Sequence, residues 1–196
     1  PEFFNFTTSE GIVLNGWMIK PTGFSSTKKY PVIQYMYGGP NSQTVKNEWL
    51  GPNYFWFQLL AQKGYLIVSV DNRGTGARGE AFNKCVYKQL GKLETMDQIE
   101  VAKWLGKQTY VDADRIGAWG WSYGGYMTSL LMTKGAEYFK AAVAVAPVTN
   151  WRFYDSIYTE RYLQMPQMNA SRYDDNSPIN FTKLLKGDFL LIHGTT

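Results

Sequence analysis

The chain has 196 residues, a length that suits one domain, and 44% of them are hydrophobic, which is enough for a substantial core. The net charge is +4, but acidic and basic residues are interspersed without a basic run or a base-stacking aromatic motif, which argues against nucleic-acid binding. The single cysteine, Cys85, excludes an intrachain disulfide and leaves the compartment open; we expect a buried or half-buried thiol.

In chain order, apolar residues in 3–8 and 11–19 flank a turn and predict a β-hairpin. After a polar loop over 21–30, strand and helix patterns alternate. The predicted strands cover 31–36, 65–70, 115–119, 141–146 and 189–192, and the predicted helices cover 53–63, 93–107 and 125–132. A turn over 111–114 is expected to lead into the strand at 115–119. This alternation predicts an α/β fold with a mostly parallel sheet.

The most informative motif is Gly120-Trp121-Ser122-Tyr123-Gly124, a G-x-S-x-G sequence between a predicted strand and a predicted helix. That context is typical of a nucleophile elbow, in which the serine hydroxyl is exposed at the C-terminal edge of a sheet. Glycines flank the serine because the turn is so tight that neighbouring backbones nearly touch. The alternative interpretation is a tight turn with a structural role only.

Acyl transfer to a serine needs hydrogen-bond donors aimed at the developing oxyanion. One donor is the backbone N–H after the nucleophile, here that of Tyr123. The second must come from the loop after an earlier strand, where Tyr37 begins the sequence Tyr-Gly-Gly-Pro and offers a phenol. The alternative is that Tyr37 is a packed aromatic residue.

Residues 147–162 are rich in aromatic side chains and follow the strand after the predicted nucleophile strand. Trp151, Tyr154 and Tyr158 recur at helical spacing and are expected to share one helix face. Such a face is usually part of a core. Because this one lies at the same edge of the sheet as Ser122, a flat apolar substrate pocket is an equally good interpretation.

Two further features point away from chemistry. Residues 74–79 fit the dinucleotide pattern G-x-G-x-x-G, but neither a clear amphipathic helix nor a suitably spaced acid follows, so we expect a loop fixed by Asp71 and Arg73, with no cofactor and no metal. His193, the only histidine, ends the strand predicted at 189–192, where the acid loop of a hydrolase usually begins. We therefore interpret His193 as structural rather than as the general base.

Segments of the chain resemble the catalytic domain of the prolyl oligopeptidase family, most closely its dipeptidyl peptidase IV branch. They follow the family's order over essentially the whole chain, at 37–40, 71–76, 120–126, 154–162 and 191–195. The Trp-Ser-Tyr-Gly-Gly and Tyr-Asp-Ser-x-Tyr-Thr-Glu-Arg-Tyr sequences are the specific ones. The resemblance implies an α/β-hydrolase fold, with a mostly parallel central sheet and helices on both faces.

The resemblance also implies a role for each matching position. Ser122 would be the nucleophile, and the Tyr37 hydroxyl and the Tyr123 N–H would form the oxyanion hole. The pocket for a penultimate proline would be lined by Val148, Trp151, Tyr154 and Tyr158. The implied activity is a serine-type exopeptidase that acts through an acyl-enzyme on peptides with proline in the second or third position, releasing Xaa-Pro dipeptides or Xaa-Xaa-Pro tripeptides.

The chain opens with Pro1 rather than Met, carries no signal-peptide pattern and has no apolar stretch of membrane-spanning length. In the family, the catalytic Asp and His follow the His-Gly-Thr segment, and a β-propeller precedes the hydrolase domain. We therefore expect residues 1–196 to be a catalytic-domain fragment without the propeller and without the C-terminal end of the sheet. We expect it to be nearly inactive alone and to self-associate through the strand edge at 188–193. Relatives imply a homodimeric, extracytoplasmic parent.

Two other functions stay open at this point. An acyl esterase on the same fold is one, because a fold does not fix a substrate. A non-catalytic interaction domain is the other, although retention of Ser122 and Tyr37 argues against it. Dipeptidyl and tripeptidyl release are equally compatible with the residues.

Overall fold

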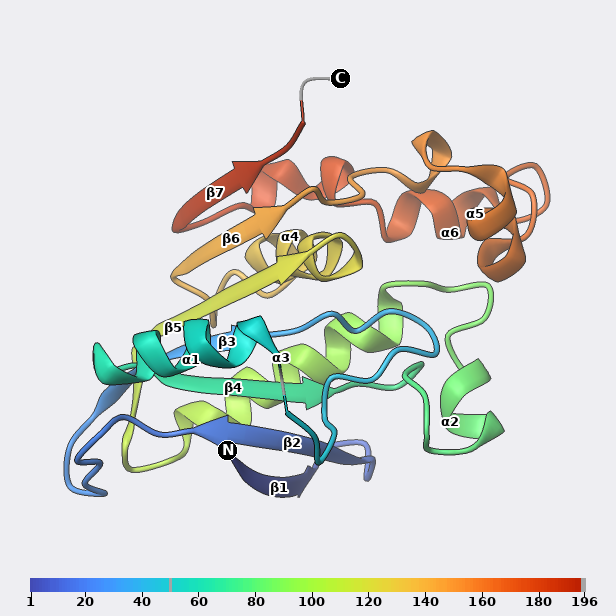
Figure 1. The fold of residues 1–196 in the computed structure, drawn as a ribbon. Helices are drawn as coiled ribbons and strands as arrows, with labels where there is room; N and C mark the ends of the chain where they lie inside the picture. Colours follow the sequence, from blue (N-terminus) through green and yellow to red (C-terminus); the bar gives the residue numbers. More distant parts are fainter. Residues whose placement is uncertain (50, 195–196) are drawn as a thin grey trace.

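A seven-stranded sheet, ordered β1-β2-β4-β3-β5-β6-β7, runs through the computed structural model, which describes residues 1–49 and 51–194 (Figure 1). The strands are β1 (Glu2–Thr7), β2 (Val13–Ile19), β3 (Tyr30–Tyr35), β4 (Leu66–Asp71), β5 (Val111–Trp121), β6 (Ala141–Val145) and β7 (Asp188–Ile192). β1 and β2 form the predicted hairpin, and β2 also pairs antiparallel with β4. All other neighbouring strands are parallel, which confirms the predicted α/β class.

Helices cover both faces of this sheet. α1 (Pro52–Gln62) packs on one face, and α3 (Lys92–Gly106) and α4 (Tyr123–Lys134) pack on the other. Three shorter helices were not predicted: α2 (Glu80–Lys84), α6 (Ala170–Asp175) and η2 (Pro178–Leu184). Two more, η1 (Trp151–Phe153) and α5 (Ser156–Leu163), lie where one helix face carrying Trp151, Tyr154 and Tyr158 was predicted. Within residues 1–49 and 51–194, none of the helices combines the length and apolar character needed to cross a bilayer.

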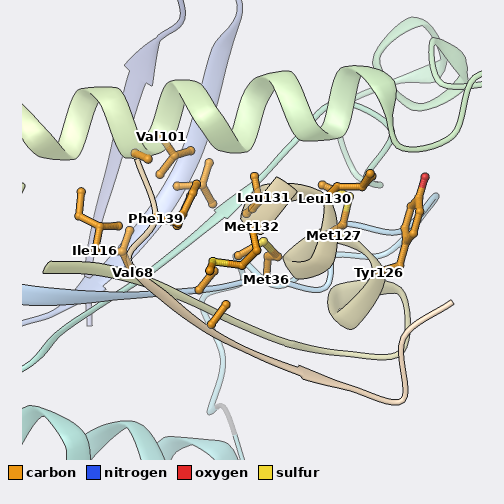
Figure 2. Close-up of a cluster of buried hydrophobic side chains, with 14 of the residues drawn as sticks. Met36, Val68, Val101, Ile116, Tyr126, Met127, Leu130, Leu131, Met132 and Phe139 are labelled. Carbon is orange, nitrogen blue, oxygen red and sulfur yellow. The ribbon is translucent and has the colours of Figure 1, made fainter. Parts of the chain in front are cut away.

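The larger core lies between the sheet and the α3–α4 layer (Figure 2). α4 is buried almost all round, because β5 and β6 contact one side of it and α3 another. Leu130, Leu131 and Met132 are fully buried, as a helix enclosed on several sides requires. The G-x-S-x-G motif lies at the N-terminus of this buried helix, so the packing of α4 fixes the position of the motif.

The opposite face is more sparsely covered. Phe57 and Ala61 of α1 pack against Trp17 and Ile67, forming a second, smaller core. Beside α1, a cavity of about 500 Å³ is lined mainly by apolar residues of β3, β5 and β6. At the far edge of the sheet, the β7 residues Leu190, Leu191 and Ile192 are exposed.

One predicted boundary was wrong. Residues 111–114 were expected to form a turn, but they are the beginning of β5, which pairs with β3 from Tyr30↔Val111 onward. The register shifts between Tyr30 and Val32, so the extra residues of β5 are accommodated by a β-bulge-like irregularity. The shift restores regular pairing before the strand reaches Trp119, next to the serine motif.

Candidate active site

Ser122 stands alone between β5, which ends at Trp121, and α4, which begins at Tyr123. Its backbone has φ 59° and ψ −116°, a conformation that residues with a side chain rarely adopt. The turn is held from both sides: the Ser122 N–H donates to the Val145 carbonyl at 2.8 Å, and the Tyr126 N–H donates to the Ser122 carbonyl at 2.9 Å. A strained, fixed serine at a strand–helix junction is the geometry of a nucleophile elbow.

The glycines around Ser122 are required by close backbone approach. A Cβ atom on Gly120 would lie 2.7 Å from the Met36 carbonyl oxygen, and one on Gly124 would be closer still to that atom. A Cβ atom on Gly125 would lie 2.6 Å from the Val145 carbonyl oxygen. The segment after β3, the segment after β6 and the start of α4 therefore meet at Ser122, as the tight-turn prediction required.

Tyr37 lies beside Ser122, two residues after the end of β3. Its phenol is half-buried, and its ring centroid lies 6.0 Å from that of Tyr123, the residue after Ser122. Burial, followed by the Tyr154 phenol, raises the pKa of Tyr37 above its ordinary value, while the Ser122 hydroxyl has a smaller lowering effect. Tyr37 is therefore a neutral phenol at physiological pH and retains its proton for donation.

Tyr123 offers two different groups. As the first residue of α4 it has a backbone N–H without an acceptor inside the helix, and this N–H belongs to the residue after Ser122. Its side chain is fully enclosed, and its hydroxyl donates to the Glu94 carboxylate (Oε1) at 2.8 Å. The ring of Tyr123 lies 5.7 Å from that of Trp151, so it also contacts the aromatic segment after β6.

The predicted single helix face carrying Trp151, Tyr154 and Tyr158 is wrong in its local structure. Trp151 belongs to η1 and Tyr158 to α5, with Tyr154 in the break between them. The break forms because Asp155 caps α5, its carboxylate accepting from the Tyr158 N–H at 2.8 Å.

The three rings nevertheless come together. Trp151 and Tyr158 stack with centroids 5.9 Å apart, and Tyr154 meets both edge-on, at 5.9 Å from Trp151 and 5.6 Å from Tyr158. Burial, then the Tyr37 phenol, raises the pKa of Tyr158 above its ordinary value. Val148 is half-buried against the larger core, just before η1.

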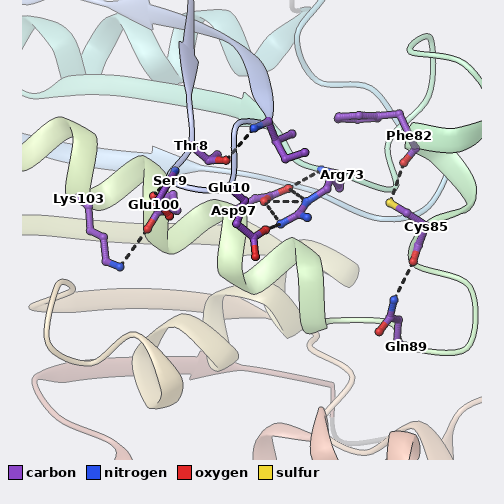
Figure 3. A network of polar contacts seen from close by, with 11 residues as sticks. Thr8, Ser9, Glu10, Arg73, Phe82, Cys85, Gln89, Asp97, Glu100 and Lys103 are labelled. Atoms are coloured by element: carbon purple, nitrogen blue, oxygen red, sulfur yellow. Dashed lines mark hydrogen bonds and ion pairs between the residues drawn. The ribbon is translucent and has the colours of Figure 1, made fainter.

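Asp71, Arg73 and Cys85 make contacts that fix neighbouring loops. The Asp71 carboxylate accepts from Thr44 and Val45. Arg73 pairs with Asp97 and Glu10 (Figure 3). Asp71 and Arg73 therefore fix the loops beside the glycine-rich segment. Cys85 is half-buried, and its thiol donates to the Phe82 carbonyl at 3.1 Å.

His193 follows β7 and is exposed, with Nδ1 3.2 Å from the Gly194 carbonyl oxygen. Within residues 1–49 and 51–194, no imidazole or carboxylate hydrogen-bonds to the Ser122 side chain.

A family model described as the prolyl oligopeptidase family matches residues 53–196. The chain belongs to the prolyl oligopeptidase family. Among curated relatives, a probable dipeptidyl-aminopeptidase B from Arthroderma otae is 46% identical over 194 residues, which is 98% of this chain and 21% of the relative. A protein of the same name from Paracoccidioides brasiliensis is 44% identical over 99% of this chain and 21% of its own length. The chain thus spans about a fifth of the length of these members of the prolyl oligopeptidase family.

Solved structures agree with this assignment. Dipeptidyl peptidase 4 from Porphyromonas gingivalis matches with a TM-score of 0.95 and 48% identity, over 98% of this chain and 27% of that one. A putative dipeptidyl aminopeptidase IV from Bacteroides ovatus matches with a TM-score of 0.93 and 39% identity, over the same shares. The fold is therefore the α/β-hydrolase fold of dipeptidyl peptidase 4-like proteins, as the sequence resemblance implied.

The polar side of α3 was not predicted from the sequence. The apolar spacing of 93–107 predicted the helix correctly, but its buried residues include Glu94, Asp97 and Gln98, whereas Met96 is exposed. These side chains are buried because each finds a hydrogen-bond partner from another element. The available signal was their spacing: positions 94, 97, 98 and 101 follow the same helical period as an apolar stripe.

Proposed function

We propose that this chain is the catalytic domain of a serine exopeptidase that releases N-terminal Xaa-Pro dipeptides from peptides. The observation that supports it most is the juxtaposition of three features: Ser122 on a strained elbow, the Tyr37 phenol against the ring of the next residue, Tyr123, and a cluster of aromatic rings that contacts Tyr123 as well. Each corresponds to a position that carries the family resemblance.

In this proposal Ser122 Oγ attacks the carbonyl carbon of the penultimate proline, and its proton passes to a general base. The tetrahedral oxyanion accepts hydrogen bonds from the Tyr37 hydroxyl and from the Tyr123 N–H at the start of α4. Collapse expels the amine of the shortened peptide and leaves a dipeptidyl ester on Ser122. Water then hydrolyses that ester by the same steps.

The aromatic cluster is suited to a proline ring. Val148, Trp151, Tyr154 and Tyr158 offer apolar faces whose positions are fixed by ring-to-ring contacts and by the Asp155 cap. A rigid pyrrolidine ring loses little rotamer entropy when it enters such a site, so its burial is converted efficiently into binding. Longer flexible side chains gain less from a flat aromatic wall.

The general base and the acid that orients it come, in this proposal, from outside residues 1–196. His193 is exposed and contacts its neighbour's carbonyl, and the chain spans only about a fifth of its curated relatives. A serine hydroxyl without a base is a weak nucleophile, and loss of one triad member removes most of the rate. The activity therefore requires the longer protein.

The test is hydrolysis of Gly-Pro-p-nitroanilide by the full-length protein that contains this chain, beside the 196-residue chain. We expect turnover by the full-length protein alone, abolished by Ser122→Ala and retained by Ser171→Ala, an exposed serine of α6.

Other outcomes separate the alternatives. Cleavage of p-nitrophenyl butyrate but not of the Gly-Pro amide by the full-length protein would support an acyl esterase. Cleavage of Ala-Ala-Pro-p-nitroanilide alone would support tripeptide release, and hydrolysis of none of these substrates would support an interaction domain. Comparable turnover by the 196-residue chain would overturn the location of the base.

A further inference from the structure

We propose that α3 positions both oxyanion donors, through three buried polar side chains on one of its faces: Glu94, Asp97 and Gln98, called here the α3 support. This inference rests on the proposed function and identifies positioning residues for the same site. Glu94, Asp97 and Gln98 are each fully or almost fully buried, an unusual place for such groups on a helix.

Gln98 begins a chain of amides that ends next to Tyr37. Its Nε2 donates to the Asn72 Oδ1 at 2.9 Å and to the Val70 carbonyl at 2.8 Å. Asn72 Nδ2 in turn donates to the Gly38 carbonyl at 3.0 Å. Gly38 directly follows Tyr37, so the amide chain connects α3 to the backbone that carries the phenol donor.

The amide chain is rigid because it is anchored at its other end as well. Gln34 of β3 donates from Nε2 to Gln98 Oε1 at 2.7 Å, and Gln34, Asn72 and Gln98 are all fully buried. Gly38 has φ 74°, and a Cβ atom there would lie 2.7 Å from Asn72 Oδ1. The backbone after Tyr37 therefore fits closely against the Asn72 amide.

Asp97 fixes the residue after Asn72. Its carboxylate accepts from the Arg73 backbone N–H at 2.8 Å and from the Arg73 guanidinium, with Nη2 2.6 Å from Oδ1 (Figure 3). Glu10 holds the same guanidinium from the β1–β2 hairpin at 2.8 Å. The Asn72–Arg73 segment thus has one fixed position relative to α3.

Glu94 supports the other donor. It lies one helical turn before Gln98, and its Oε1 accepts a hydrogen bond from the Tyr123 hydroxyl at 2.8 Å. The centroid of the Tyr123 ring lies 6.0 Å from that of Tyr37 and 5.7 Å from that of Trp151, and the Tyr123 backbone begins α4. One face of α3 is therefore linked by hydrogen bonds to both segments that would supply the oxyanion hole, directly to Tyr123 and through Asn72 to Gly38, although no residue of α3 is proposed to touch substrate.

A double-mutant cycle in the full-length protein tests the Tyr37 branch with Gly-Pro-p-nitroanilide. Asn72→Asp, which removes the donor to Gly38, should lower kcat about tenfold or more and change KM less than about threefold, since small misplacements of catalytic groups cost rate. If Asn72 acts through Tyr37, adding Asn72→Asp to Tyr37→Phe should lower kcat by no more than about twofold further. Multiplicative effects would overturn the inference.

Two controls exclude a general loss of structure. Asn176→Asp introduces the same carboxyl group at a buried amide whose Oδ1 accepts from Lys134, and it should leave kcat unchanged. If Asn72→Asp does not give a cooperative melt, Asn72→Gly, which deletes the amide without adding charge, replaces it in the cycle. A fall in melting temperature without a fall in kcat for either variant would contradict the proposal.

The Tyr123 branch is tested by rescue. Glu94→Gln retains an oxygen acceptor for the Tyr123 hydroxyl and should keep most of kcat, whereas Glu94→Met removes it and should lower kcat at constant KM. Equal kcat for the two variants would overturn this branch. A full-length wild-type protein that cleaves no Xaa-Pro amide overturns the proposed function and this inference with it, whereas activity without the expected coupling overturns the inference alone.

Discussion

Two regions of the molecule, the buried face of α3 and strand β7, differ in which side chains they bury. The α3 support and its partner Asn72 are polar and buried. Leu190 and Leu191 of β7, at one edge of the sheet, are apolar and exposed. Burial in this chain thus follows the availability of partners rather than hydropathy alone. We therefore expect substitutions in the site around Ser122 and in the α3–α4 layer to change activity and stability more than substitutions in β7.

Apart from loss of the Ser122 hydroxyl itself, the largest expected fall in kcat follows removal of the Tyr37 hydroxyl. Tyr37→Phe in the full-length protein should lower kcat on a Gly-Pro amide by about 100- to 1000-fold, the usual cost of one oxyanion donor. Tyr138→Phe, a partly buried tyrosine after the far end of α4, is the matched control and should change kcat little. Similar rates for both variants would remove Tyr37 from the oxyanion hole.

A pair of leucine truncations sharpens the same comparison in stability. Leu131→Ala, fully buried in α4, should lower the free energy of unfolding by about 2–5 kcal/mol, because it removes packing and leaves a cavity. Leu191→Ala, on exposed β7, should cost about 0.5 kcal/mol or less. Denaturant unfolding of the 196-residue chain measures both, and equal costs would contradict the assignment of the core to the α4 side.

The buried Glu94 carboxyl predicts a pH effect. Burial raises its pKa from 4.5 to about 7, against smaller opposing effects from the backbone amides of Gly91 and Glu94. A raised carboxyl pKa means that the folded state binds more protons than the unfolded chain between those values. Its contribution to stability is therefore complete below pH 4.5 and is lost as pH rises through 7.

Glu94→Gln removes this titration. The stability of the wild type relative to Glu94→Gln should fall by on the order of 3 kcal/mol between pH 4.5 and pH 8. Urea unfolding at a series of pH values provides the measurement. Parallel pH profiles for the two proteins would show that Glu94 is not a neutral buried acid.

A further, smaller effect on stability concerns strain at Ser122. Because φ is 59° there, Ser122→Gly should stabilise the chain by about 1 kcal/mol while abolishing any activity that depends on the hydroxyl. Ser122→Ala keeps the strain and should leave stability nearly unchanged. A Ser122→Gly variant less stable than Ser122→Ala would mean that the elbow conformation is relaxed.

The sequence predicts the elbow because its causes are local. Gly120 and Gly124 flank a serine where a strand pattern gives way to a helix pattern, and the structure shows both glycines against the Met36 carbonyl. The sheet class followed for a similar reason, since apolar runs and their alternation with helices are visible in short windows.

The remaining features depend on contacts distant in the chain. The polar face of α3 is buried because Asp97 meets Arg73, 24 residues away, and Gln98 meets Gln34, 64 residues away. No short window contains both partners. The break between η1 and α5 was missed for a different reason: the Asp155 cap is a single local contact that outweighs an aromatic spacing compatible with one helix.

The central claim is that Ser122 is the nucleophile of a post-proline exopeptidase. The most direct measurement treats the full-length protein with a dipeptide diphenyl phosphonate ending in proline, which loses phenol to an attacking serine oxygen, and identifies the modified residue by mass spectrometry. We predict one adduct, on the tryptic peptide covering residues 116–134, and none on Ser122→Ala. An unmodified Ser122, or an adduct on another residue, would contradict the account.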